Sequence, residues 1–169
     1  MMKLVTVFVI VLVQTACFGQ VSIIGTHKSY FGEKLELKSD HTFHYTWRFD
    51  MASSWTTGEW TVSNDTLYLT PILVFDTLKV LNAANVVQDT LVLSSDVIAS
   101  RIGKKEFIYA SISSGWQHRK KPPVRLYIEN GKLFTVLANG QLDRRKRKPV
   151  WGNIRYQTYF EKVQEENLE

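Results

Sequence analysis

Residues 42–49 alternate strictly between aromatic and polar side chains, and this period of two constrains the fold more than any other feature of the chain. Phe43, Tyr45, Trp47 and Phe49 stand at every second position. Successive side chains of a strand point to opposite faces of a sheet, so the segment predicts a strand with one aromatic and one polar face. Residues 34–38 alternate in the same way, and the turn cluster 39–41 joins the two runs. The sequence therefore predicts a β-hairpin here.

The same pattern of short strands and polar turns continues downstream. Residues 58–62 and 66–70 flank a polar turn, and the steps Asn130-Gly131 and Asn139-Gly140 suit tight hairpins. Further expected segments are a short helical turn at 95–101 and strands at 86–94, 106–111, 124–128, 132–137, 141–145 and 153–163. Short strands joined by polar turns indicate an all-β fold. We expect an antiparallel up-and-down barrel of roughly 8–10 strands, with a β-sandwich as the alternative.

The first nineteen residues have the layout of a secretory signal peptide. Lys3 gives a positive start, residues 4–13 are apolar or small, and residues 14–19 turn polar and small. Such a run is too short to span a bilayer, which takes about 20 residues. We therefore expect residues 1–19 to be removed, residues 20–163 to form one barrel domain and residues 164–169 to fray. The predicted location is secreted or periplasmic.

Cys17 leaves an alternative open. A bacterial lipoprotein signal places small and aliphatic residues before a cysteine that is then lipidated; Thr15 and Ala16 fit that pattern, but Gln14 does not. We favour cleavage after Gly19, which yields a free protein, over lipid anchoring through Cys17. Cys17 is the only cysteine of the chain, so the expected mature protein has no disulfide of its own.

Several short motifs resemble a family. The order of these motifs is similar to that in small lipocalin-like (calycin-type) barrel proteins exported by Gram-negative bacteria. The motifs are Gly25-Thr26-His27, Leu35-Glu36-Leu37, Asp40-His41-Thr42-Phe43, Gly58-Glu59-Trp60 and Asp65-Thr66-Leu67. The resemblance covers residues 23–70 and departs at His27, where the family has an aromatic residue. It implies a lipocalin-like barrel with an internal cavity and a structural role for Trp60. It implies no reaction.

The aromatic residues suggest one candidate ligand site. The members are Phe43, Tyr45, Trp47, Phe49 and Trp60. They either line a cavity for a small apolar molecule or form the packed core of the domain. The core interpretation is favoured because small barrels usually fill themselves with side chains.

Two basic clusters suggest a second candidate site. The residues are Trp116, His118, Arg119, Lys120 and Lys121 in the first cluster and Arg144, Arg145, Lys146, Arg147 and Lys148 in the second. Adjacent cations repel, so both clusters should be exposed. They either bind a polyanion of the cell envelope or serve as solvated hairpin ends that blunt an edge strand. Cytoplasmic nucleic acid is not an expected partner.

Catalytic and metal sites are not predicted. Four scattered histidines and no cysteine partner give no metal-ligand spacing, and no nucleophile or carboxylate pair is placed as catalysis requires. No cofactor is expected. We predict an exported, non-enzymatic barrel that binds an apolar ligand or an anionic envelope component. A polyanion-binding protein is the alternative, and an uncharacterised hydrolase is third.

Overall fold

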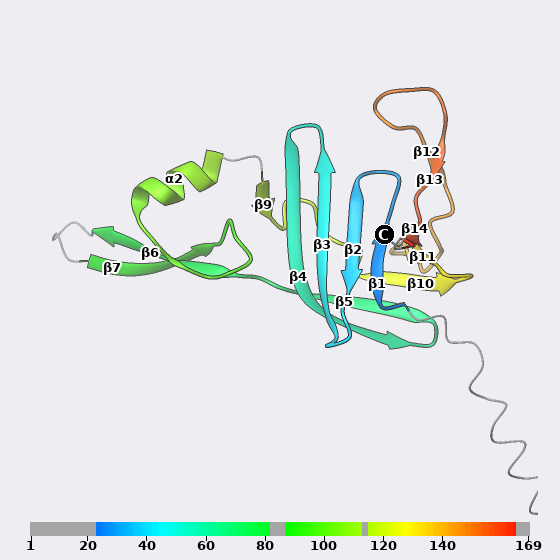
Figure 1. The fold of residues 1–169 in the computed structure, drawn as a ribbon, viewed down its shortest axis with the longest axis horizontal. Helices are drawn as coiled ribbons and strands as arrows, with labels where there is room; N and C mark the ends of the chain where they lie inside the picture. The colour runs from blue at the N-terminus through cyan, green and yellow to red at the C-terminus, as the bar shows by residue number, and fades with distance from the viewer. Residues whose placement is uncertain (1–22, 82–86, 113–114, 165–169) are drawn as a thin grey trace, which may run out of the picture.

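The alternating segments form the walls of a closed barrel. The computed structural model describes residues 23–81, 87–112 and 115–164. The barrel strands are β1 (Gly25–Lys28), β2 (Glu33–Leu37), β3 (Thr42–Phe49), β4 (Ala52–Ser63), β5 (Thr66–Ile72), β10 (Arg125–Glu129), β11 (Lys132–Thr135) and β14 (Phe160–Lys162). They pair antiparallel in the order β3-β2-β1-β14-β11-β10-β5-β4, and β4 pairs back with β3 to close the ring (Figure 1). The predicted all-β, up-and-down barrel is confirmed.

The predicted hairpins form around residues suited to tight turns. Leu35 of β2 lies opposite Tyr45 of β3. The β4–β5 turn uses positive φ angles of 48° at Asn64 and 56° at Asp65. The β10–β11 turn uses Asn130 in the same way, at 51°, before Gly131 at 73°. Asn and Asp tolerate this left-handed conformation and Gly adopts it freely, which explains why the turns occur at these positions.

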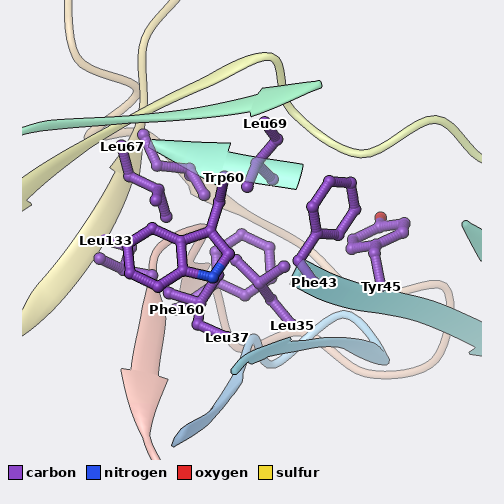
Figure 2. Packing of buried hydrophobic residues seen from close by; sticks show 10 residues of the cluster. Leu35, Leu37, Phe43, Tyr45, Trp60, Leu67, Leu69, Leu133 and Phe160 are labelled. Carbon is purple, nitrogen blue, oxygen red and sulfur yellow. The ribbon is translucent and has the colours of Figure 1, made fainter. Parts of the chain in front are cut away.

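Inward-facing side chains fill the middle of the barrel (Figure 2). The buried cluster consists of Leu35, Leu37, Phe43, Tyr45, Trp60, Leu67, Leu69, Leu126, Leu133 and Phe160. Each such side chain contributes about 1.5–3 kcal/mol when it leaves water. Gly58 makes room for Phe43, the residue opposite it on β3. A Cβ at Gly58 would lie 2.7 Å from Cε1 of Phe43 and 2.1 Å from the carbonyl oxygen of Thr70.

The two long connections, 73–124 and 136–159, lie at the same end of the barrel as the shorter connections 29–32 and 50–51. The strand registers place the connections 29–32, 50–51, 73–124 and 136–159 at this end, which we call the mouth. The short turns 38–41, 64–65 and 130–131 lie at the opposite end. β14 also ends there beside the start of β1, where the amide of Val163 donates to the carbonyl of Thr26 at 2.8 Å. Binding residues concentrate on loops held by a rigid scaffold, so the mouth is where a site is expected.

The connection between β5 and β10 forms a separate lobe at the left of Figure 1. Strands β6 (Phe75–Leu81), β7 (Val87–Leu93) and β8 (Arg101–Ile102) form a sheet in the order β7-β6-β8, followed by helix α2 (Lys104–Ile112). Strand β9 (Gly115–Gln117) returns the chain to the barrel and pairs parallel with β4. The buried side chain of Gln117 joins lobe to barrel: it accepts from the amide of Val74 at 2.8 Å and donates to the carbonyls of Val74 and Ser94.

Two secondary-structure predictions are wrong in the lobe. Residues 106–111, predicted as a strand, belong to α2, because the Glu106 carboxylate accepts from the amide of Gly103 at 2.6 Å and caps the first turn. Residues 95–101 were predicted to include a helical turn. Residues 95–98 instead form bends, and residue 101 already belongs to β8. Side chains there take the backbone groups a helix would use: the Ser94 hydroxyl accepts from the amide of Asp96, and the buried Asp76 carboxylate accepts from that of Ser100.

Two further strand predictions, for residues 141–145 and 153–163, differ from the structure in the C-terminal third of the chain. Residues 141–145 contribute one bridge, Leu142 to Val136, instead of a strand, because β14 takes the place beside β11. Residues 153–163 divide into β13 (Tyr156–Gln157) and β14; β13 pairs with β12 (Lys146–Arg147) in a two-stranded ribbon.

Among the described residues, no helix is both long and apolar enough to cross a lipid bilayer. The predicted signal peptide, with Cys17, lies outside the described residues. The same holds for residue 86, the first residue of the predicted strand 86–94, and for the predicted tail beyond Gln164.

Candidate binding site at the barrel mouth

The two basic clusters are far apart in the sequence and meet at the mouth. A cavity of about 360 Å³ is lined by Lys120 and Lys121 from the first cluster and by Arg147 from the second. Its apolar wall consists of Phe31, Trp47, Pro122, Pro123 and Leu137. Its remaining lining residues are Glu33, Thr135, Asp143 and Thr158. We call this cavity the mouth pocket; it combines an aromatic surface with cationic side chains.

A second cavity adjoins the mouth pocket. It measures about 510 Å³ and shares Phe31 and Trp47 with the first. It extends outward past Phe49 to Pro149 and Val150, which follow the second basic cluster. Trp47 therefore stands between the two cavities, where one apolar molecule could contact both.

The first basic cluster is positioned by strand β4. The backbone at His118 turns with φ of 56°, and its amide donates to the carbonyl of Trp55 at 2.8 Å. The amide of Lys120 then donates to the hydroxyl of Ser54 at 2.9 Å. These bonds direct Lys120 and Lys121 over the mouth. The His118 ring lies 3.3 Å from the Thr56 hydroxyl, and no carboxylate partner of it is found in the part of the chain that the structure describes.

Glu33 joins the floor of the mouth pocket to the core. Its carboxylate accepts from the hydroxyls of Ser29 at 2.8 Å and Tyr45 at 3.1 Å, and Nζ of Lys120 lies 3.8 Å away. Burial, together with the neighbouring Glu33 charge, raises the pKa of the Tyr45 hydroxyl. Tyr45 therefore stays protonated and donates to the carboxylate throughout the physiological range.

Asp143 is the anionic centre of the second basic cluster. Its carboxylate is 2 % exposed and accepts from Nε of Arg145 at 2.7 Å and Nη2 of Arg147 at 2.8 Å. Hydrogen bonding to Arg145, with the added charge of Arg147, lowers the pKa of Asp143 to about 2. Arg144 instead pairs with Glu129 at 2.7 Å. The cluster is exposed as predicted, but three of its five cations are already paired.

The predicted aromatic residues divide between two environments. Phe43, Tyr45 and Trp60 belong to the packed core. Trp60 lies toward the end opposite the mouth, where its Nε1 donates to the carbonyl of Lys38 at 3.1 Å. Trp47 packs against the core and lines the mouth pocket, whereas Phe49 is exposed.

The remaining predicted residues take no part in lining the mouth pocket. Trp116 is half-buried in β9 beside Ser54, and Arg119 is exposed. His27 is buried, with Nε2 2.8 Å from the carbonyl oxygen of Ile23, and His41 lies against Trp60 with ring centroids 4.7 Å apart. Within residues 23–81, 87–112 and 115–164, no three His, Cys, Asp or Glu residues are grouped to hold a metal ion.

Some lining residues carry no distinguishing pattern in the sequence. Phe31 and Leu137 are ordinary apolar residues near turns, and only the closed barrel brings them to the mouth. The pair Pro122-Pro123 beside Lys121 was a usable indication, because prolines following a basic run mark an exposed, stiff loop.

Comparisons with protein family models, with curated proteins and with solved structures find no match to this chain. The functional argument therefore depends on the geometry of the mouth.

Proposed function

We propose that the protein is an exported, non-enzymatic binding protein that holds a small amphipathic anion in the mouth pocket. The observation that carries this proposal is the meeting of Trp47, Lys121 and Arg147 around one cavity of about 360 Å³. Small-molecule sites typically measure roughly 300–1,000 Å³. Polar and apolar residues contribute to the lining of this pocket in similar measure, which suits an amphipathic, charged ligand better than a purely apolar one.

The two kinds of lining residue have separate tasks in this proposal. Phe31, Trp47 and the two prolines contact the apolar part of the ligand, where burial of carbon surface provides affinity. The ammonium groups at the rim contact the anionic part. Lys121 has no ion pair among the described residues, whereas Lys120 lies at 3.8 Å from Glu33. Lys121 is therefore the cation most available to a ligand.

A matched pair of dyes tests the proposal. 1-Anilinonaphthalene-8-sulfonate carries an anionic group on an aromatic body, and N-phenyl-1-naphthylamine has nearly the same body without the charge. We expect Trp47→Ala to weaken binding of both dyes about tenfold, since it removes the shared apolar wall. We expect Lys120→Gln/Lys121→Gln to weaken the sulfonate about fivefold and to leave the neutral dye unchanged.

Lys104→Gln/Lys105→Gln is the control, because it removes the same charge from α2 on the lobe. Circular dichroism on every variant confirms the fold, since the sulfonate dye also binds partly unfolded chains. Equal dye affinity in both double variants would reject the mouth pocket as the anion site. Unchanged binding in Trp47→Ala would reject the apolar half of the proposal.

Export is the second part of the proposal, and the sequence at residues 1–19 supports it. Expression of the full sequence in a Gram-negative host, followed by intact-mass measurement, tests it. A chain that begins at Gln20 supports the free form. A chain that begins at an acylated Cys17 supports the anchored form, and a chain that retains residues 1–19 contradicts both.

A further inference from the structure

The loop between β12 and β13 carries an exposed apolar tip. Val150, Trp151 and Ile154 are 67 %, 82 % and 67 % exposed. The loop projects from the barrel at the upper right of Figure 1, and Gly152 turns it with φ of 109°. A tryptophan at this exposure contributes nothing to the core, and an apolar cluster at a loop tip indicates a contact surface.

Cations surround the tip on both sides. Residues 144–155 contain six Lys or Arg and no Asp or Glu. The three that flank the tip, Lys146, Lys148 and Arg155, have no ion pair within the described residues, in contrast to the three arginines held by Glu129 and Asp143. The surface therefore pairs an apolar tip with a collar of available positive charge.

The base of the loop is braced against the barrel. Arg147 of β12 lies opposite Tyr156 of β13 in the antiparallel ribbon. The Thr158 hydroxyl donates to the carbonyl of Asp143 at 3.1 Å. The Tyr156 ring stacks on Tyr30 with centroids 3.4 Å apart and planes 9° apart. The tip is therefore held out from a fixed support, which lowers the entropy cost of contact.

The apolar surface continues from the loop onto the barrel. Val150 lines the same cavity as Phe49, an exposed residue at the end of β3. Met51 follows in the β3–β4 turn and is 80 % exposed. Phe49 and Val150 thus share one cavity wall at the mouth, which the charged residues Arg48, Asp50 and Lys148 also line.

We infer that the β12–β13 loop inserts its tip into the interfacial layer of an anionic lipid bilayer. Tryptophan favours that layer because its ring is apolar and its N–H remains hydrated. Aliphatic side chains beside it enter the acyl boundary, and each cation near an anionic surface adds about 1 kcal/mol. A soluble polyanion would use the cations but would leave the apolar tip in water. The inference rests on the loop and is independent of the ligand in the mouth pocket.

Vesicle sedimentation tests the inference with the protein purified from cells that express the full sequence. The vesicles consist either of phosphatidylcholine alone or of phosphatidylcholine with phosphatidylglycerol at about 30 mol %. We expect binding to the anionic vesicles, and a loss of about tenfold in affinity for Trp151→Ser/Ile154→Ser. The control Ile98→Ser/Ile112→Ser removes two equally exposed aliphatic residues from the lobe and should bind as the unaltered protein does.

Fluorescence quenching distinguishes insertion from surface adhesion. Lipids brominated along the acyl chain should quench part of the tryptophan emission, and Trp151→Phe should abolish that quenching although four other tryptophans remain. Equal affinity for both vesicle types, or full binding by the Trp151→Ser/Ile154→Ser variant, would overturn the inference. Binding without quenching that salt removes completely would also overturn it and would indicate a surface polyanion site.

Discussion

Nη2 of Arg147 donates to Oδ2 of Asp143 at 2.8 Å, and this contact fastens β12 to the wall of the mouth pocket. The same carboxylate binds Arg145. Five consecutive cations repel one another beside the barrel. The buried Asp143 carboxylate offsets part of this repulsion and so stabilises the two-stranded ribbon.

Replacing Asp143 with Asn should therefore loosen the ribbon. The amide keeps the shape but leaves two guanidinium groups without their counter-charge. We expect the free energy of unfolding to fall by about 1–2 kcal/mol, because exposed arginines are screened by solvent. Urea denaturation measures the change. The control Glu129→Gln removes a carboxylate paired with a single arginine and should cost less; an equal cost would contradict the assigned role of Asp143.

The same carboxylate should give stability a defined pH dependence. Its pKa is about 2 in the folded protein and near 3.9 in an unfolded chain. The folded state therefore binds the proton less readily, and the stabilisation is complete above about pH 5 and declines as pH falls toward 2. The difference in stability between the unaltered protein and Asp143→Asn should shrink between pH 5 and about 2. A constant difference would contradict this assignment.

His27 should produce a second pH effect at higher pH. Because the carbonyl of Ile23 can only accept, Nε2 carries the proton, and the buried Nδ1 has no hydrogen-bond partner. Burial lowers the pKa of His27 below 6.5. The unfolded chain therefore takes up a proton first, and stability should decline as pH falls below about 6.5.

His27→Phe should reduce this decline, measured as the thermal midpoint between pH 7.5 and 5. Phe removes the titrating group and keeps an aromatic ring at this buried position. His118→Phe is the comparison: burial also lowers the pKa of His118, but its side chain is only half-buried at the mouth, so this variant should reduce the decline less than His27→Phe does. An unchanged slope in His27→Phe would show that another group causes it.

Gln117 should control the attachment of the lobe. Gln117→Leu keeps the size of the side chain but leaves the amide of Val74 and the carbonyl of Ser94 without these bonds. The carbonyl of Val74 loses one of its two donors and keeps the amide of Ser94. We expect a loss of about 2–3 kcal/mol and faster amide hydrogen exchange in β6 and β9 than in β2 and β3. Uniformly faster exchange in all four strands would contradict a local role.

Gly58 should not tolerate a methyl group. The Cβ of alanine would lie 2.1 Å from the carbonyl oxygen of Thr70, which cannot move without breaking the β4–β5 ladder. We expect Gly58→Ala to cost about 1–3 kcal/mol. Gly131→Ala is a useful contrast: its Cβ meets no atom within 4 Å, so any cost arises from its φ of 73° alone. Gly58→Ala with unaltered stability would contradict the packing described for Phe43.

The hairpins were predictable because each depends on neighbouring residues. Alternation at residues 42–49 specified the inward face of β3, and turn-forming residues such as Asn130-Gly131 set the pairing of the flanking strands. Closure of the barrel was less accessible, because it joins β1 to β14 across more than a hundred residues. The residue pattern of one hairpin does not indicate which distant strand will pair with it.

The helix α2 was missed because its sequence resembles a strand. Phe107, Ile108 and Tyr109 have high strand propensity, but the cap between Glu106 and Gly103 starts a helix. Part of the candidate site could be predicted, because the positive charge of both basic clusters is visible in the sequence. Their meeting at Arg147 and Lys121 follows from the topology, as does the pairing of three arginines.

The adjacency of Val163 and Thr26 has a practical consequence for measurement. Both ends of the barrel segment leave from the side that carries the short turns. An affinity tag or a sensor surface coupled beyond either end would therefore hold the molecule with its mouth toward the solution. Immobilised protein should bind dyes and vesicles as freely as protein in solution, and coupling through a cysteine introduced at Met51 should block both.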